Sequence, residues 1–327
     1  MREVLLAAAA HFSSDERDAP EDANRLRRMD RFGRAGYRAG TRAFAAAGLA
    51  RGERADSRCG VVVGTRHGCR SAITEHAARL AAAARVEDLA PSVFAATVHN
   101  TVNGELAIAL GLGGISETIV SGRTAGLEAL ILGARRVAEG DADRVLVVAA
   151  EGIDDAMREA WEEEKAAFGK RAAGVGLVES AAAVLLEARE TSDFPRFVEG
   201  CLFFEPDARR AAARFFEWMK SDVARWGGDA APPAVIFCGP SYEDFLEGNT
   251  QEERDGGGGV ANGPRVERFG ASGLYEIARE VAARRAQAAH QPSPHSPSRK
   301  IHLYVTREMT GAVAAVALES ETYSSSS

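Results

Sequence analysis

Uninterrupted apolar runs recur along the first half of the chain, separated by segments in which apolar residues follow a helical spacing. The runs CGVVVGT (59–65), RVLVVAAEG (144–152) and SAAAVLLE (180–187) show no alternation with polar residues, which predicts strands buried on both faces. Apolar residues at i, i+3, i+4 and i+7 cover 127–134 and predict a helix with one core-facing side. This alternation of buried strands and amphipathic helices predicts a layered α/β protein.

The same periodicity predicts elements over the rest of the chain. These are an edge strand at Val4–Ala8, helices over 22–48, 71–84, 95–110 and 273–288, a helix around Phe215–Val223, strands at 118–121 and 234–239, and a closing hairpin over 301–319. Loops are predicted where glycine, proline or serine accumulate, at 249–264 and 290–300, and the serine-rich tail 320–327 is expected to be disordered.

Composition narrows the class of protein. The 327 residues are 46% hydrophobic and 27% charged, and the net charge of −7 gives no reason to expect nucleic acid as a partner. Four cysteines and seven histidines show no spacing typical of a metal site, so we expect no metal or cofactor and a reduced, cytoplasmic setting. No apolar stretch approaches the about 20 residues of a membrane span, and the first residues show no cleavage site of a signal peptide.

The segment 118–152 contains the most informative residue. It reads as an apolar strand, a tight turn of small residues, an amphipathic helix and a second buried strand. Such a turn lifts one side chain out at the helix N-terminus, where backbone N–H groups favour an anion, and a cysteine there would be a reactive thiolate. Here that side chain is Arg123, whose guanidinium cannot act as a nucleophile. The pattern therefore predicts an enzyme scaffold without its nucleophile.

Four blocks of sequence, in this order and spacing, resemble the β-ketoacyl synthases of the thiolase fold. They are RRMDRFGRAGYRAGTRAFAAAGL (27–49), CGVVVGTRHG (59–68), PSVFAATVHNTVNGELAIALGLGG (91–114), and the stretch from the turn at Arg123 through ADRVLVVAAEG (142–152) to VESAAAVLLE (178–187). The resemblance covers 27–187 and implies an α/β fold with thiolase-like α-β-α-β-α layers. It also implies an N-terminal half at 1–190 and a reduced, contracted C-terminal half at 191–319.

The resemblance further implies where catalytic residues should lie, because these enzymes use a cysteine with two histidines, or with a histidine and an asparagine, for decarboxylative condensation. The family's Cys-x-x-Gly reads Arg123 to Gly126 here, so the glycine is present and the cysteine is not. The first histidine matches Cys238, the second matches Gly270, and the Gly-Phe-Gly-Gly turn before the last strand reads Arg307–Gly311. Every catalytic position that can be matched is altered.

Arg123 itself allows three interpretations. It could be an exposed residue at a helix start, it could be buried and paired with Glu117, Glu128 or Glu151, or it could bind an anionic group such as a phosphopantetheine or a malonyl carboxylate. Pairing is favoured, because an unpaired buried arginine is too costly. The acidic run Trp161–Lys165 is interpreted as the solvated face of a helix.

Cysteine and histidine residues give weaker candidates. Cys238 could be a displaced nucleophile, but a free cysteine at a buried strand end is typical of a small apolar core residue. Cys69 closely follows His67, yet positions so near in sequence do not face each other usefully on a regular element. His99 and Asn100, in the block that resembles the family's dimer region, are expected to form hydrogen bonds at a helix or an interface.

The resulting hypothesis is a catalytically silent β-ketoacyl-synthase-like subunit. It would pair with an active ketosynthase, as a chain-length factor does in type II polyketide, polyene or fatty-acid-like biosynthesis, and shape the acyl tunnel, with an acyl carrier protein as a further partner. The candidates for binding, tunnel or dimer contacts are Asn100, Ile119, Val120, Arg123, Thr124 and Gly126. Two alternatives are an acyltransferase or thioesterase that uses Cys238 or Ser121 as a relocated nucleophile, and a stand-alone homodimeric acyl-binding protein.

Overall fold

Ten strands form one mixed sheet, which consists of two halves of five strands each. The structure is a computed structural model and describes residues 2–12, 22–52, 56–85, 91–168, 175–189, 195–219, 221, 234–238, 261–262, 266–267, 269–288, 298–307 and 312–322. The first half contains β1 (Val4–Phe12), β2 (Cys59–Thr65), β3 (Ser116–Val120), β4 (Arg144–Glu151) and β6 (Ser180–Ala188). The second half contains β7 (Arg196–Phe204), β8 (Ala234–Phe237), β9 (Ala261–Asn262), β11 (Ser298–Arg307) and β12 (Ala312–Thr322). A separate parallel pair is formed by β5 (Gly176–Leu177) and β10 (Val266–Glu267).

The two halves of the sheet repeat one topology. From its outer edge the first half runs β3-β2-β4-β6-β1, which is the third, second, fourth, fifth and first of its strands in chain order. The second half runs β9-β8-β11-β12-β7 and has the same order. The halves meet where β1 pairs with β7, with Val4 opposite Phe197 and Leu5 opposite Arg196. This leaves β3 at one outer edge of the sheet.

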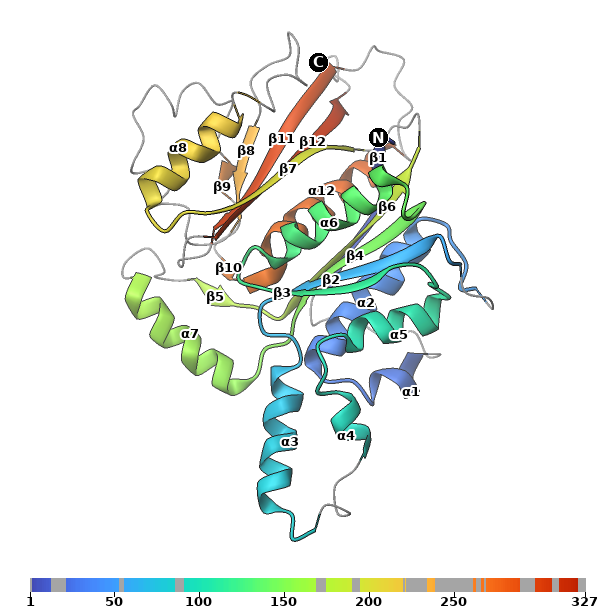
Figure 1. The fold of residues 1–327 in the computed structure, drawn as a ribbon, viewed down its shortest axis with the longest axis vertical. Helices are drawn as coiled ribbons and strands as arrows, with labels where there is room; N and C mark the ends of the chain where they lie inside the picture. The colour runs from blue at the N-terminus through green and yellow to red at the C-terminus, as the bar shows by residue number, and fades with distance from the viewer. Residues whose placement is uncertain are drawn as a thin grey trace.

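Helices form the other layers. They are α1 (Ala23–Leu26), α2 (Arg31–Ala46), α3 (Arg70–Ala82), α4 (Pro91–Ala95), α5 (Thr101–Leu110), α6 (Ala125–Glu139), α7 (Asp155–Phe168), α8 (Ala208–Trp218) and α12 (Ser272–Ala288). α2 and α5 cover the outer face of the first half, α6 and α12 lie between the halves, and α8 covers the second half (Figure 1). The α-β-α-β-α layering implied by the resemblance is confirmed, while the contraction of the second half stays a prediction.

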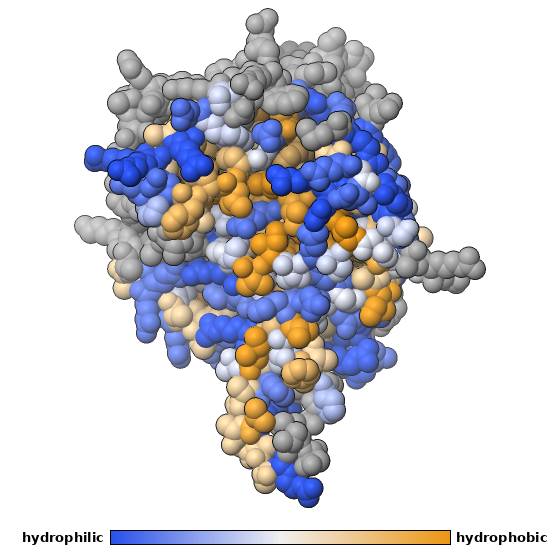
Figure 2. All heavy atoms as spheres, viewed as in Figure 1, coloured by the Kyte–Doolittle hydropathy of each residue, from blue (hydrophilic) through white to orange (hydrophobic). Residues whose placement is uncertain are grey.

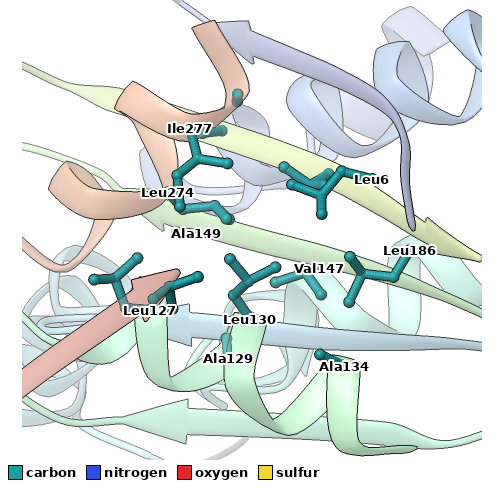
Figure 3. Packing of buried hydrophobic residues seen from close by; sticks show 14 of the residues in the cluster. Leu6, Leu127, Ala129, Leu130, Ala134, Val147, Ala149, Leu186, Leu274 and Ile277 are labelled. Carbon is teal, nitrogen blue, oxygen red and sulfur yellow. The ribbon is translucent and has the colours of Figure 1, made fainter. Parts of the chain in front are cut away.

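Three hydrophobic clusters hold the layers together. In the central one, Leu127 and Leu130 of α6 pack with Val147 and Leu186 of the first half-sheet and with Ile277 of α12 (Figure 3). A second cluster packs α2 and α5 against the opposite face of the same strands, and a third packs α8 against the second half. Both faces of β2, β4 and β6 are therefore buried, which explains why these strands are unbroken apolar runs in the sequence.

Most predicted elements are present, but three predictions are wrong in detail. The segment 22–48 is two helices, because Asp30 has an extended backbone and its carboxylate caps the first turn of α2. The helix predicted over 95–110 begins only at Thr101, because a turn at 96–100 separates α5 from α4, which ends at Ala95. Val4–Ala8 is not an edge strand, because β1 lies in the middle of the sheet between β6 and β7.

Short strands also occur inside segments that the sequence predicts to be loops or tail. Residues 261–262 form β9, Ser298–Lys300 begin β11, and 320–322 are the end of β12, so the prediction of a disordered tail is wrong for these last three residues. The rest of these three segments lies outside the described residues.

The sequence does not predict β7, because its residues are mostly half-buried and give no unbroken apolar run.

Candidate functional site

Close backbone packing holds the turn between β3 and α6. A Cβ atom on Gly64 of β2 would lie 2.3 Å from the carbonyl oxygen of Ala125, and one on Gly126 would lie 2.6 Å from the carbonyl oxygen of Gly270. Neither position can hold a side chain unless the backbone moves. The second contact also brings Gly270, which precedes α12, against the first turn of α6. Arg123 lies three residues before Gly126 in this turn, so Arg123 and Gly270, two positions that the sequence matches to catalytic residues, belong to the same region of the structure.

Arg123 is buried at this turn, with 1% of its side chain exposed. Its Nη2 atom donates a hydrogen bond to Oε1 of Glu164 on α7, at 2.9 Å. Its guanidinium carbon lies 6.0 Å from the ring centre of Trp161, which is on the same helix. The burial excludes an exposed arginine at a helix start and supports the expectation of an acidic partner.

The predicted identity of that partner is wrong. Glu117 pairs with an arginine of α6, Glu128 accepts hydrogen bonds from two hydroxyls of the turn, and Glu151 is bound elsewhere. The run that was interpreted as a solvated face supplies the partner instead, because Trp161 and Glu164 turn inward from α7. The signal that could have identified them is their spacing, since residues three apart share one face of a helix.

A second acidic residue of the site, Glu151, is buried against the loop that follows β2. Glu151, at the end of β4, has a relative exposure of 0%. It accepts hydrogen bonds from Oγ1 of Thr65 at 3.1 Å and from the backbone N–H groups of Arg66 and His67. Nδ1 of His67 lies 3.3 Å from the same carboxylate. The loop after β2 therefore folds around this group.

Gly270 lies against the same carboxylate. A Cβ atom at this position would be 2.8 Å from Oε1 of Glu151 and 2.8 Å from the backbone nitrogen of Arg66. Contacts this short leave no room for a larger side chain. The position that the resemblance matches to a catalytic histidine is therefore closed by a carboxylate of the same chain.

The cysteines have apolar or neutral surroundings. Cys238 is buried, and its thiol donates to the carbonyl oxygen of Ile236 at 3.7 Å. Cys69 is fully buried with its Sγ atom 3.6 Å from Nδ1 of His99, a pair that the sequence did not reveal because 30 residues separate its members. Burial raises the pKa of the Cys69 thiol to about 11, so the sulfur stays a neutral thiol. His67 faces the buried carboxylate instead.

We expect the thiols of Cys59 and Cys69 to resist alkylation in the native protein at pH 8. Burial raises their pKa values to about 12 and about 11, so the reactive thiolate is scarce. Peptide mass mapping after brief iodoacetamide treatment of native and urea-unfolded protein measures this, with the half-buried Cys201 as internal control. Rapid native modification of Cys69 would contradict the expectation and indicate a reactive pair with His99.

Of the predicted binding, tunnel or dimer residues, Ile119 and Val120 lie on the edge strand β3, whereas Arg123, Thr124 and Gly126 are buried at the turn. Among the described strands β3 pairs with β2 alone, and Val120 at its end is 47% exposed while Ile119 is half-buried. Asn100 is exposed just before α5 and makes no side-chain capping bond to that helix, so of the hydrogen bonds expected at a helix or an interface, the one at the helix is not formed as a cap. The buried asparagine is Asn103, whose amide donates to the carbonyl oxygen of Glu117 at 2.7 Å and joins α5 to β3.

The arm formed by α3 and α4 presents apolar side chains to solvent. Of the 13 residues of α3, Ala72 is the one that is buried. Figure 2 shows apolar residues over the projecting arm, and the large exposed ones on the arm and in the turn after it are Ile73, Leu80, Phe94 and Val98. A helix of this length is marginal in water without packing, and contiguous exposed apolar surface is typical of an interaction site.

Metal ligands and membrane helices are absent from the part of the chain that the structure describes. No group of three or more His, Cys, Asp or Glu side chains in the described ranges could hold a metal ion. Nor does any described helix have the length and apolar character that crossing a bilayer requires. The three residues that follow Cys238, at 239–241, and residues 308–311 of the matched Gly-Phe-Gly-Gly turn lie outside the described residues.

Five alternating layers, a repeated strand order and a tight turn at the start of a central helix define a thiolase-like α/β protein. The family model of the β-ketoacyl synthase N-terminal domain matches residues 8–192. The chain therefore belongs to the β-ketoacyl synthase family.

Solved structures share this fold over nearly the whole chain. A chain from the AntDE:AntF structure, a type II polyketide synthase acyl-carrier protein in complex with its ketosynthase bound to the hexaketide, has a TM-score of 0.74 and 17% identity, covering 98% of this chain and 99% of that chain. The ishigamide ketosynthase/chain length factor has a TM-score of 0.68 and 21% identity, covering 94% of this chain and 86% of that chain. A β-ketoacyl synthase from Burkholderia phymatum has a TM-score of 0.74 and 14% identity, covering 99% of this chain and 100% of that chain. A direct sequence comparison with curated proteins gives no match.

Proposed function

We propose that this chain is a non-catalytic β-ketoacyl-synthase-like subunit that pairs with an active ketosynthase and shapes its acyl tunnel, as a chain-length factor does. The setting would be cytoplasmic type II polyketide, polyene or fatty-acid-like biosynthesis, with an acyl carrier protein as the further partner. Two of the similar solved structures contain a type II polyketide ketosynthase or a ketosynthase/chain length factor, which supports this setting.

The observation that carries the proposal is the buried arginine at the turn. Arg123 occupies the place of a nucleophile, is 1% exposed and is held by Glu164. A guanidinium stays protonated in proteins and can neither attack a thioester nor carry an acyl chain. Replacing the arginine alone would not rebuild the chemistry, because Glu151 closes the space at Gly270.

A relocated nucleophile is disfavoured by the surroundings of both candidates. The hydroxyl of Ser121 donates to Oε1 of Glu128 at 2.9 Å, and the same oxygen also accepts from the hydroxyl of Thr124, so this carboxylate is engaged in holding the turn. Cys238 is buried and its thiol donates to a backbone carbonyl. Both groups thus act as donors to acceptors of the same chain, which supports a non-catalytic role.

Pairing with another subunit is supported by the surface around β3. Among the described strands β3 has a neighbour on one side, so its other edge offers backbone groups that a second strand could bind, and such edges are normally covered in native proteins. The exposed Val120 on this edge and Ile108 on the neighbouring α5, which is 73% exposed, add apolar surface. The apolar arm of α3 and α4 extends from the same half of the molecule (Figure 1).

Co-expression with a cysteine-containing ketosynthase from the same biosynthetic system tests the pairing. We expect affinity purification of this chain to retain the ketosynthase, and native mass spectrometry to give a one-to-one complex. Val120→Lys should weaken the complex at least about tenfold, because it buries an unpaired charge at the interface.

The matched control is Leu202→Lys. Leu202 is 54% exposed on β7, so this change places the same charge on a similarly exposed apolar residue away from the β3 edge, and it should leave the complex intact. A clean monomer without a partner would contradict the proposal. A homodimer that ignores the ketosynthase would support a stand-alone acyl-binding protein instead.

A further inference from the structure

Two guanidinium groups converge on one carboxylate oxygen at the candidate site. Oε1 of Glu164 lies 2.9 Å from Nη2 of Arg123 and 3.6 Å from Nη2 of Arg66. The two arginines come from different loops, one after β2 and the other after β3. A pair of arginines aimed at one oxygen is the donor set that proteins use to bind carboxylates and phosphates.

The position of Arg123 increases the positive potential there. It directly precedes the N-cap residue Thr124, where the dipole of α6 adds partial positive charge. A buried cation in such a place favours an anion within reach of its guanidinium. The carboxylate of Glu164 therefore occupies a site that favours an anion for reasons independent of its own helix.

The helix that carries Glu164, α7, packs on a small hydrophobic cluster of its own. α7 packs through Met157 and Trp161 onto a small cluster with Ile153 and Val175, distinct from the three clusters between the layers. Glu164 is 20% exposed. A movement of α7 can thus remove the carboxylate and admit solvent without disturbing the layers that hold both arginines.

We propose that Arg66 and Arg123 form a binding site for the carboxylate of a small organic acid or of a carboxyl-terminated acyl group. Glu164 is the internal occupant of this site and competes with the ligand. The ligand binds when α7 moves away, so its apparent affinity depends on how often α7 is displaced. This site goes beyond the proposed pairing and can fail without affecting it.

Weakening the internal competitor tests this site. Isothermal titration calorimetry at fixed ionic strength would compare wild type with Glu164→Gln, using succinate against neutral succinamide and succinyl-coenzyme A against butyryl-coenzyme A. We expect Glu164→Gln to bind succinate, succinyl-coenzyme A or both at least about tenfold more tightly than wild type, because a neutral amide competes poorly for two guanidiniums. Succinamide and butyryl-coenzyme A, which lack the terminal carboxylate, should show no gain.

Glu163→Gln is the matched control, because it removes the same charge from the adjacent, exposed position of α7 and should leave binding unchanged. Adding Arg123→Gln or Arg66→Gln to the Glu164 variant should abolish the gain, and circular dichroism would confirm that each variant is folded. The proposal is overturned if folded Glu164→Gln binds the carboxylates no better than wild type, or if Glu163→Gln shows the same gain.

Discussion

Replacing Glu151 with alanine is expected to lower the free energy of unfolding by about 3–5 kcal/mol. The carboxylate is fully buried and accepts hydrogen bonds from the backbone of Arg66 and His67 and from the hydroxyl of Thr65. Alanine would leave these donors without their acceptor, and each unsatisfied buried donor costs about 1–3 kcal/mol. Urea unfolding followed by circular dichroism measures the difference.

Two further variants make this measurement specific. Glu163→Ala removes a carboxylate from the exposed face of α7 and should change stability by less than about 0.5 kcal/mol. Glu151→Gln preserves one acceptor oxygen and should lie between wild type and Glu151→Ala. If Glu151→Ala were as stable as Glu163→Ala, this carboxylate would not organise the loop after β2.

Replacing Gly270 with histidine should destabilise the chain by at least about 3 kcal/mol and give no condensing activity. The first added carbon would already lie 2.8 Å from the carboxylate of Glu151 and from the backbone of Arg66. A histidine could enter only if the loop after β2 and the end of β4 moved. The urea midpoint and a condensation assay with acyl carrier protein thioesters check both parts of this prediction.

Gly104 provides the comparison for that glycine substitution. A Cβ atom there would meet nothing within 4 Å, and the residue lies exposed within α5. Gly104→Ala should therefore stabilise the protein slightly, by about 0.5–1 kcal/mol, because alanine favours the helix. Equal stability of Gly270→His and wild type would show that the catalytic position is open and that Glu151 does not close it.

The layered fold could be predicted because its strands are buried on both faces. β2, β4 and β6 pack against helices on each side, so their sequences must be continuously apolar, and this pattern is visible without a structure. The prediction of β1 as an edge strand is wrong, because an apolar run of that length does not reveal how many neighbours a strand has. The break at Asp30 depends on a capping hydrogen bond, which periodicity does not report.

For the candidate site, the sequence predicts the backbone turn but not which side chains meet there. The turn at Arg123 and the small residue Gly126 follow from local sequence, since the close packing of that turn requires a glycine. The sequence analysis missed the partner Glu164, because it comes from a helix 41 residues later whose acidic run is typical of a solvated face, and its spacing of three from Trp161 is the one local signal of an inward face. The pair of Cys69 and His99 is likewise a product of the tertiary fold.

Intact-protein mass spectrometry of the co-purified pair tests most directly whether this chain is catalytically silent. The pair would be incubated with an acyl carrier protein thioester, and the mass of each chain would then be read separately. We expect an acyl adduct on the ketosynthase partner and none on this chain, because Arg123 cannot form a thioester. An acyl adduct on this chain, at Ser121, Cys238 or any other residue, would contradict a non-catalytic role.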